Sequence, residues 1–423
     1  MMKFLELGLK PEILKALENM GYWDLTPIQE KTFSAILDGR DVLARAETGS
    51  GKTAACGIPL VQRIDPSLVA IQALILVPTR ELALQYVDEI DKISTFTKVI
   101  PFAVFGGFSM EIQKAKLRDG VHLLVATPGR LIDLLYHSTS VDLSCVRTLV
   151  LDEADEMLKM GFVEDIEWIM SCLVQEHQIL FFAATMPEEI NRLTKTYLKE
   201  PVRVELNKEQ VVPKSLAHHF QYTGRGHRLN ALIDYLKSEK ISQAIIFCNS
   251  RHYGEKLTRE LEGNFKSIGY IHGGLEQSKR TSICNRFRRN EITFMVATDL
   301  ASRGLDFSHV SHVINYDYPY HQESYTHRTG RTGRMGRSGV AMTFVTDREL
   351  SVLSSLFEAN RIHPVWHGSI PKLRAVSKPN GKQNGQKYFS KRSRSTPRPR
   401  MLSKGGHSLV LEQQGAGLVH GVQ

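Results

Sequence analysis

The sequence predicts an α/β protein with two tandem parallel-sheet domains and a disordered, basic C-terminal tail. Short, almost continuously apolar runs alternate with helical patterns, and this alternation occurs twice along the 423 residues. Apolar strands separated by helices are typical of parallel sheets that helices cover on both faces. A polar stretch over 206–214, which includes Pro213, separates the two occurrences. The sequence therefore predicts two similar domains joined by a linker.

The apolar runs locate the strands that we expect in each half. They cover 41–44, 73–77, 123–126, 149–151 and 179–182 in the first half, and 244–247, 294–297, 313–316 and 342–345 in the second. A chain of this length has room for two domains of about 150 residues each. We predict a first domain over 1–205, a linker over 206–214, a second domain over 215–366 and a tail over 367–423.

The basic charge of the chain lies in its tail. From Lys372 to Gln423 there are 11 Lys and Arg residues and one acid, Glu412, so this segment has a net charge of +10. The whole chain has a net charge of +9, and the residues before Lys372 therefore have a net charge of −1. The run over 393–400, which reads Ser-Arg-Ser-Thr-Pro-Arg-Pro-Arg, is typical of disordered segments. A cationic tail favours a polyanionic partner, or alternatively it only keeps the protein in solution.

Cysteine usage and hydropathy predict a cytoplasmic protein. The five cysteines show neither a CxxC pair nor zinc-ligand spacing, so we expect reduced thiols. No apolar run approaches the roughly 20 residues that a membrane helix needs, and the first residues resemble a helix more than a signal peptide.

Residues 46–53 form a phosphate-binding loop that reads Ala-Glu-Thr-Gly-Ser-Gly-Lys-Thr. Its glycines let backbone N–H groups approach phosphates, Lys52 reaches the β- and γ-phosphate oxygens, and Thr53 ligates Mg²⁺. The loop lies between the apolar run 41–44 and a helical pattern from about Lys52, which is the context that such a loop requires. We expect the nucleotide phosphates to contact Thr48, Gly49, Ser50, Gly51, Lys52 and Thr53.

Two carboxylates directly follow the apolar run 149–151, in the sequence Asp152-Glu153-Ala154-Asp155. Ligands of parallel α/β sheets bind at the carboxyl ends of the strands. Asp152 is therefore predicted to hold Mg²⁺, often through water, and Glu153 to polarise the attacking water. With the phosphate loop, this motif predicts an ATP hydrolase that uses ATP and Mg²⁺.

Arginines recur at every third position over 327–334, which reads His-Arg-Thr-Gly-Arg-Thr-Gly-Arg. On a helix this spacing places Arg328, Arg331 and Arg334 along one side. Arginines held against a γ-phosphate stabilise the charge of the transition state. We therefore expect arginine fingers in the second domain.

The ordered set of motifs resembles that of the DEAD-box RNA helicases of superfamily 2. The resemblance covers about Phe4 to Thr346. It rests on residues 21–22, 26–29, 46–53, 78–83, 106–107, 127–130, 152–155, 184–185, 247–251, 272–273, 277, 280, 297–306 and 327–334. It implies two RecA-like domains and an ATPase that RNA stimulates.

The resemblance also implies roles for individual residues. Gln29 reads the adenine edge, Tyr22 stacks on the ring and Phe4 supports that pocket. Asp299 and Asp306 bridge the cleft and hold the ribose, and Arg331 and Arg334 are the fingers. Contacts with RNA phosphates and 2′-hydroxyls, largely independent of sequence, come from Pro78, Thr79, Arg80, Gly107, Thr127, Gly129, Arg130, Arg251, Gly273, Gln277, Arg280 and Thr298.

The chain departs from the family pattern at four positions. Leu25 replaces a usual proline, Gly274 stands where Asp is frequent, and Ser302 replaces a common Ala. Ala183 replaces the usual serine of a Ser-Ala-Thr motif whose hydroxyl helps connect the acidic motif to the closed cleft. This last change predicts an altered coupling of hydrolysis to unwinding.

Two functions of different classes fit these motifs. The first is an ATP-dependent RNA helicase in which RNA closes the cleft, ATP is hydrolysed and a duplex is locally unwound. The second is an ATP-gated RNA clamp that nucleates a ribonucleoprotein and unwinds little, and DNA translocation is a third and weaker alternative. We expect a monomer without membrane contact, with ribonucleoprotein or ribosome-assembly partners.

Overall fold

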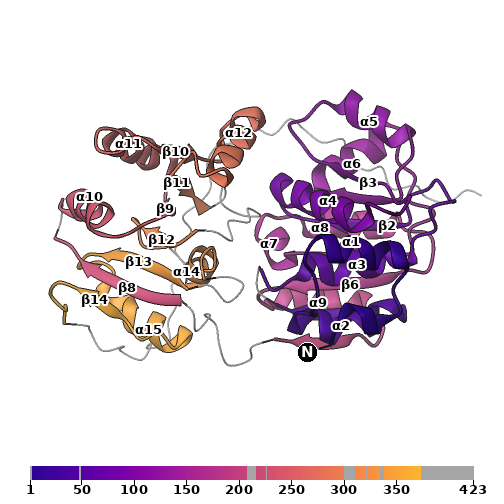
Figure 1. The fold of residues 1–423 in the computed structure, drawn as a ribbon, viewed down its shortest axis with the longest axis horizontal. Coiled ribbons are helices and arrows are strands. Elements are labelled where there is room, and N and C mark those ends of the chain that lie inside the picture. The colour runs from indigo at the N-terminus through magenta and orange to yellow at the C-terminus, as the bar shows by residue number, and fades with distance from the viewer. Residues whose placement is uncertain are drawn as a thin grey trace, which may run out of the picture. The chain divides into compact units, whose positions relative to one another are not determined.

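The computed structural model describes residues 2–46, 49–206, 216–224, 226–299, 310–319, 322–333 and 338–372. Its ribbon contains two sheets, each built from a separate half of the chain (Figure 1). The predicted linker over 206–214 and the predicted tail lie almost wholly outside the described residues, so both boundaries stay predictions.

The first sheet has seven parallel strands in the order β3-β4-β2-β5-β6-β1-β7. The strands are β1 Val42–Arg45, β2 Ala73–Leu76, β3 Pro101–Val104, β4 Leu123–Ala126, β5 Thr148–Leu151, β6 Gln178–Ala183 and β7 Val202–Glu205. Leu76 pairs with both Ala126 and Leu151, so β2, β4 and β5 end level at one edge. That edge receives the loops in which most of the first-domain motifs lie.

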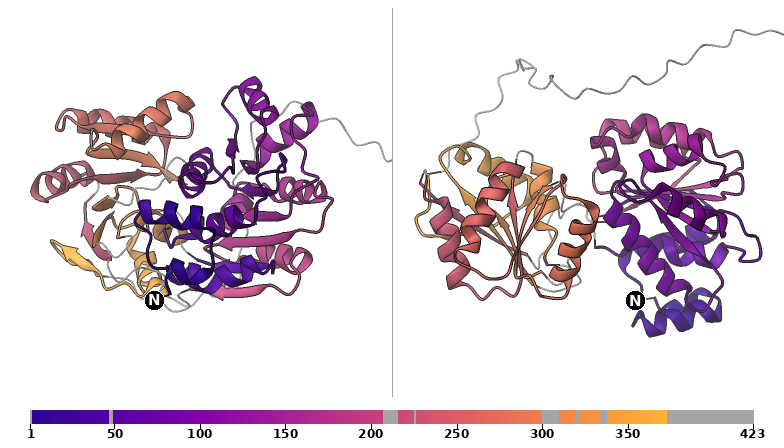
Figure 2. Two further views of the ribbon diagram at one scale, coloured as in Figure 1. Left: turned by 45° about the vertical axis from the view of Figure 1, so that its right-hand side comes forward. Right: turned by 90° about the horizontal axis from the view of Figure 1, so that it is seen from above.

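Helices cover both faces of this sheet. One face packs against the 3₁₀ helix Phe4–Leu7 and against α1 Pro11–Asn19, α2 Pro27–Leu37, α3 Lys52–Arg63 and α4 Arg80–Ser94. The other packs against α5 Met110–Arg118, α6 Pro128–His137, α7 Ala154–Lys159, α8 Val163–Ser171 and α9 Glu188–Tyr197. Side chains alternate between the faces, since Ala73 and Ile75 join the first core and Leu74 and Leu76 the second. Figure 2 shows this layering.

The second sheet has the order β10-β11-β9-β12-β13-β8-β14 and is again parallel throughout. Its strands are β8 Leu216–Tyr222, β9 Ala244–Cys248, β10 Ile268–Ile271, β11 Phe294–Thr298, β12 His312–Asn315, β13 Gly339–Val345 and β14 Val365–His367. Its helices are α10 Arg228–Ser238, α11 Arg251–Glu262, α12 Gln277–Arg288, α14 Gln322–Thr329 and α15 Leu350–Asn360. Numbered from its own first strand, this sheet repeats the strand order of the first.

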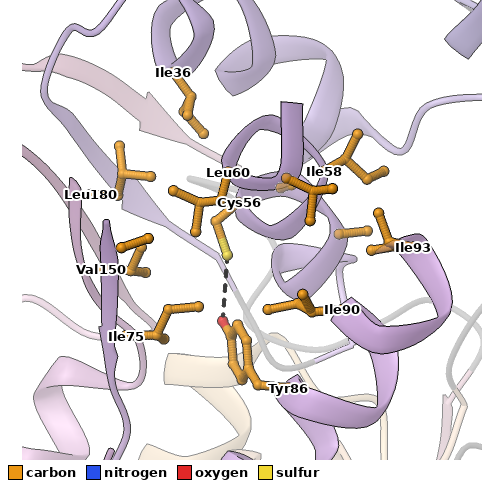
Figure 3. Packing of buried hydrophobic residues seen from close by; sticks show 14 of the residues in the cluster. Ile36, Cys56, Ile58, Leu60, Ile75, Tyr86, Ile90, Ile93, Val150 and Leu180 are labelled. Carbon is orange, nitrogen blue, oxygen red and sulfur yellow. Dashed lines mark hydrogen bonds between the residues drawn. The ribbon is translucent and has the colours of Figure 1, made fainter. Parts of the chain in front are cut away.

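The core beneath the first sheet is packed around α3 and α4. Figure 3 shows Ile58, Ile90 and Ile93 on these helices facing Ile75 and Val150 on the strands. Cys56 and Tyr86 point toward each other inside this apolar cluster, and both are fully buried. A polar pair in an apolar core calls for an explanation, because buried polar groups are costly unless they are hydrogen-bonded.

The predicted fold class is confirmed. All nine predicted runs coincide with strands, within three residues at their ends. Within the described part of the arginine repeat, only the first residues are helical: α14 ends at Thr329, where Gly330 follows, and Gly333 has a left-handed φ of 69°. Over the described part of the chain, no helix combines the length and hydropathy of a membrane span.

Candidate ATP and RNA sites at the sheet edges

The phosphate loop joins β1 to α3 as predicted. Gly49 and Gly51 have φ angles of 87° and 94°, in the left-handed region that glycine adopts at low cost. A Cβ atom on Gly51 would lie 2.9 Å from both the Gln29 amide nitrogen and the Thr26 hydroxyl oxygen. Only glycine therefore fits there, and the free N–H groups at the start of α3 form an anion-binding end. Thr48 lies outside the described residues.

Lys52 is buried at the start of α3 and pairs with Asp152. Its Nζ atom lies 3.2 Å from Asp152 Oδ1 and donates to the carbonyl oxygen of Ala46 at 3.2 Å. Burial alone lowers the pKa of Lys52, but the charges of Asp152, Glu153 and Asp155 together outweigh burial and leave this pKa raised. Lys52 is therefore held as a cation where the phosphates of a nucleotide carry their charge.

Asp152 is held at both carboxylate oxygens. Oδ1 accepts from Lys52 and, at 2.8 Å, from the backbone N–H of Glu153. Oδ2 accepts from the Tyr86 hydroxyl at 2.7 Å. Because donors on three different segments fix this carboxylate, its orientation is set before any nucleotide binds.

Glu153 adopts a strained backbone and carries a buried carboxylate. Its φ and ψ angles of 50° and 44° lie in the left-handed region, which is uncommon for a residue other than glycine. Burial raises the pKa of the Glu153 carboxyl, an effect that Lys52 and Arg331 partly oppose. A carboxylate with a raised pKa is better suited to accept a proton.

Asp155, the last acid of the motif, is joined to the segment after β6. One of its oxygens accepts from the backbone N–H and the hydroxyl of Thr185, at 3.0 and 2.8 Å. The other accepts from the N–H of Ala184 at 3.4 Å. Ala183 itself is buried in the apolar core of the second face. The segment after β6 is therefore joined to the acidic motif through Ala184 and Thr185, without a hydroxyl at position 183.

Of the three residues predicted to bind adenine, two contact each other and the third contacts the phosphate loop. The rings of Phe4 and Tyr22 stack, with centroids 6.5 Å apart. The Gln29 side chain caps α2 by accepting from the N–H of Thr26 at 2.8 Å and donates to the Gly51 carbonyl oxygen at 3.2 Å. Gln29 thus connects this corner to the phosphate loop, whereas its contact with adenine remains a prediction.

In the first domain, the predicted RNA residues gather on the half of the sheet edge that the ATP residues leave free. Pro78, Thr79 and Arg80 follow β2, Gly107 follows β3, and Thr127, Gly129 and Arg130 follow β4. These strands are neighbours in the order β3-β4-β2, and the ATP motifs follow the adjacent group β5-β6-β1. The topology thus gives the two sets of motifs separate parts of one edge.

Arg80 and Gly107 depend on each other for their positions. Gly107 has a φ of 78°, and a Cβ atom there would lie only 2.2 Å from Nη1 of Arg80. Arg130 Nη1 donates to the Phe108 carbonyl oxygen at 3.0 Å, which ties α6 to the same loop. The loop after β3 therefore seats both arginines.

The second sheet places its predicted RNA residues in the equivalent positions. Arg251 follows β9, Gly273 follows β10, and Thr298 ends β11, the three strands that correspond to β2, β3 and β4. Arg280 lies on α12, and its Nε atom lies 2.9 Å from Glu81 Oε1. Gln277 begins α12, but its side chain lies outside the described residues.

Gly274 provides space for Arg251. A Cβ atom on Gly274 would lie 2.3 Å from the guanidinium carbon of Arg251, so the guanidinium rests directly on this glycine. The glycine that departs from the family pattern is thus in contact with a predicted RNA-binding arginine.

Arg328 holds Asp299. This arginine is buried, and its Nε and Nη2 atoms donate to the two oxygens of Asp299 at 2.5 and 2.8 Å. Nη2 also donates to Asn249 Oδ1 at 2.7 Å, and Nη1 donates to the Asp317 carbonyl oxygen at 2.7 Å. These contacts fix Asp299 at the end of β11. Arg331 lies beyond the helix and is also buried, while Asp306 and Arg334 fall outside the described residues.

Two residues of these sites escaped sequence reasoning. Tyr86 occupies an apolar position of α4, so its spacing indicates only a core residue. Arg328 belongs to the arginine repeat, but spacing on a helix could not show that Asp299 and Asn249 surround it.

Family models match both domains. The DEAD/DEAH box helicase model matches residues 26–193, and the model of the helicase conserved C-terminal domain matches residues 221–336. The DEAD-box ATP-dependent RNA helicase CshA of Geobacillus kaustophilus is 43% identical over 353 residues, which are 84% of this chain and 75% of that protein. The ATP-dependent RNA helicase CshA of Listeria monocytogenes is 41% identical over 361 residues, 85% of this chain and 69% of that protein.

Solved structures agree with these matches. The DEAD-box helicase Mss116 bound to single-stranded RNA and UDP-BeF superposes with a TM-score of 0.80 at 31% identity, covering 88% of this chain and 81% of that one. Dbp5 of S. cerevisiae, bound to RNA and ADP BeF3, gives a TM-score of 0.79 at 28% identity, covering 86% of this chain and 95% of that one. With two RecA-like domains, a phosphate loop beside an Asp-Glu-Ala-Asp motif and relatives of this identity, the chain belongs to the DEAD-box family of ATP-dependent RNA helicases.

Proposed function

We propose that this helicase hydrolyses ATP with the residues at the β5-β6-β1 edge and binds RNA with those at the β3-β4-β2 and β10-β11-β9 edges. The observation that carries the proposal is the pairing of Lys52 with Asp152, directly before the strained Glu153. Lys52 neutralises phosphate charge, and Glu153 accepts the proton of the attacking water. Arg331 and Arg334 stabilise the charge that develops on the transferred phosphoryl group.

The donor set at this edge fits Mg²⁺. Among the described residues no group of three or more His, Cys, Asp or Glu side chains is arranged to hold a metal ion. Mg²⁺ does not need such a cage, because it keeps several waters and binds through one or two carboxylates plus substrate phosphates. The Thr53 hydroxyl and the Asp152 carboxylate are hard oxygen donors of this kind. When bound, the ion neutralises phosphate charge.

Binding of RNA to both domains favours the closed cleft, in which hydrolysis is fast, and release of phosphate reopens it. The names of the relatives support duplex unwinding over a clamp that unwinds little. The basic tail adds phosphate contacts that are independent of sequence. We also propose that the protein acts as a cytoplasmic monomer and assists ribonucleoprotein or ribosome assembly.

Steady-state ATPase assays with and without single-stranded RNA test this proposal. Wild-type protein should hydrolyse ATP faster with RNA than with DNA of the same sequence. Glu153→Gln should bind ATP and RNA but hydrolyse slowly, while Glu164→Gln, at an exposed position of α8, should behave as wild type. Normal turnover by Glu153→Gln would exclude the assigned role, and equal stimulation by DNA would exclude RNA selectivity.

A further inference from the structure

Tyr86 connects the core of the first domain to the ATP site. It lies on α4, its side chain is fully buried, and its hydroxyl donates to Asp152 Oδ2 at 2.7 Å. The Cys56 thiol lies 3.8 Å from the same phenol oxygen, and Figure 3 shows the two side chains pointing toward each other. A tyrosine with no function in a core of Ile, Leu and Val would bring a polar atom there at a cost.

We propose that Tyr86 is a positioning residue for ATP hydrolysis: its hydroxyl fixes the Asp152 carboxylate for Mg²⁺ and nucleotide. This inference rests on the proposed function, because it assigns Tyr86 to the site in which Asp152 acts. Tyr86 lies outside the motifs on which the family resemblance rests, so its role is additional to the proposed function.

The contacts of Asp152 give the hydroxyl a specific task. Lys52 and the Glu153 N–H both bind Oδ1, so their contacts leave the second carboxylate oxygen, Oδ2, to another donor. Tyr86 binds Oδ2 and completes the restraint. Groups that orient a metal ligand in this way typically change metal affinity or activity by about 10- to 100-fold when they are removed.

The phenol is a permanent donor in this position. Burial, and then the charge of Asp152, raise the pKa of Tyr86 well above its ordinary value. The protonated phenol is the form that can donate to Asp152, as the 2.7 Å contact shows.

The packing around the ring fixes the hydroxyl in space. Figure 3 shows Ile75, Val150 and Ile90 around Tyr86, and the whole cluster is buried. Cys56 lies one helical turn after Lys52 and Thr53 on α3, and its thiol is also 3.4 Å from the Thr53 carbonyl oxygen. The Cys56–Tyr86 contact thus joins α3, which carries the predicted phosphate ligands, to α4.

Helix α4 also carries predicted RNA residues at its other end. Thr79 caps the helix by accepting from the N–H of Leu82 at 3.3 Å, and Arg80 is its first residue. Tyr86 follows Arg80 by six residues, about 9 Å along the helix axis at 1.5 Å per residue. One rigid helix therefore holds both a predicted RNA contact and the donor to Asp152.

Tyr86→Phe tests the proposal because it removes one oxygen atom and leaves the ring. We expect the RNA-stimulated kcat to fall on the order of tenfold, with a smaller change in the KM for ATP. The Mg²⁺ concentration that half-saturates binding of a non-hydrolysable ATP analogue should rise by a similar factor. This second readout does not depend on turnover, and a purely structural role for the hydroxyl would leave it unchanged.

Two control variants distinguish the loss of the Tyr86 hydrogen bond from a general loss of packing or of a buried hydroxyl. Ile90→Val loosens the same cluster without removing a hydrogen bond, and Tyr235→Phe removes the hydroxyl of another buried tyrosine, on α10. Both should keep the wild-type Mg²⁺ midpoint. A shift in Ile90→Val as large as that in Tyr86→Phe would overturn the proposal in favour of packing alone.

A double-mutant cycle decides whether Tyr86 acts through Asp152. In the Asp152→Asn background, Tyr86→Phe should change the Mg²⁺-dependent affinity for the analogue by less than twofold, because its target is already altered. Full additivity of the two changes would overturn the proposal. If wild-type protein shows RNA-stimulated ATPase and Tyr86→Phe equals it in every assay, only the role of Tyr86 is lost. If wild-type protein shows no such activity, the proposed function itself is lost.

Discussion

At the scale of single residues, the candidate ATP site contains a backbone conformation and a buried charge that are unfavourable for stability, and the proposed function explains both. Glu153 combines a left-handed backbone with a buried carboxylate whose pKa burial raises. Asp152 next to it is held by three donors. Strained or buried charged residues persist where the surrounding structure enforces them, and they gather at functional sites.

The first prediction concerns stability and pH. Because the pKa of Glu153 is raised above its ordinary 4.5, the folded protein binds this proton more tightly than the unfolded chain does. The stability contributed by this proton is therefore fully present below pH 4.5 and is lost as the pH rises through the raised pKa of the folded protein. Glu153→Gln should raise the Tm at pH 8, and this gain should shrink as the pH falls below the folded-state pKa toward 4.5. Thermal denaturation of Glu153→Gln and Glu164→Gln across this range checks the sign, and a gain that is independent of pH would contradict it.

The second prediction concerns Thr185, which joins the acidic motif to β6 by two hydrogen bonds to Asp155. Thr185→Val removes the side-chain bond and keeps the shape, which costs about 1 kcal/mol or more for a bond to a charged group. We expect several-fold less RNA duplex unwound per ATP, with a smaller effect on basal ATPase. Thr194→Val, at a buried position of α9, is the control. Unchanged unwinding per ATP in Thr185→Val would show that Thr185 does not replace the serine missing at position 183.

At the scale of elements, the hydrophobic pattern predicted most inner strands of the two sheets and missed all four edge strands. The nine predicted runs became strands that are largely buried, because helices cover both faces of each sheet and favour apolar side chains there. The strands β3, β7, β10 and β14 went unpredicted because each lies at a sheet edge, is short and is partly exposed. The strand β8 also went unpredicted, because it includes His218, His219 and Gln221 and its burial alternates.

For the candidate sites, the sequence predicted which residues lie at a sheet edge but not which side chains they contact. Motifs at strand ends fixed which residues share an edge, because parallel strands end together. Their partners could not be read from the sequence, since the contacts of Tyr86 with Asp152 and of Arg328 with Asp299 join positions 66 and 29 residues apart. Gly330 is a helix-stop signal within the arginine repeat, and α14 ends directly before it, at Thr329.

The third prediction concerns the loop after β3. Gly107→Ala places a Cβ atom against the Arg80 guanidinium in a left-handed backbone, so both the loop and the arginine must move. RNA affinity should fall, and the slope of log K against log salt should flatten by about 0.7 if one phosphate contact is lost. Gly106→Ala is a matched control, because its Cβ would lie an ordinary 3.7 Å from Arg80. Equal affinities for the two variants would remove Arg80 from the predicted RNA contacts.

At the scale of the whole molecule, the chain repeats one strand order in two sheets. In each sheet the three strands at one side of the edge carry the predicted RNA residues. In the first sheet the neighbouring three carry the ATP residues. A duplicated fold thus provides two sheet edges for the predicted RNA contacts, and the second domain carries the predicted ATP residues Asp299 and Arg331.

The fourth prediction concerns the basic tail. Removal of the residues after Pro371 should leave a folded ATPase that RNA still stimulates, because all strands that the structure describes end by His367. RNA affinity should weaken, and the salt slope should flatten by about 0.7 for each phosphate contact that the tail makes. Fluorescence titrations of both proteins at several salt concentrations check this. An unchanged slope would favour a role in solubility alone.

The most direct test of the account is the separation of a short RNA duplex by wild-type protein and by Glu153→Gln under otherwise equal conditions. The account predicts that wild-type protein separates the strands repeatedly when ATP is present. Glu153→Gln should bind the same duplex and ATP but separate it at most once per enzyme, because the closed state persists. Wild-type protein that hydrolyses ATP with RNA yet leaves the duplex paired would contradict the account and favour an ATP-gated clamp.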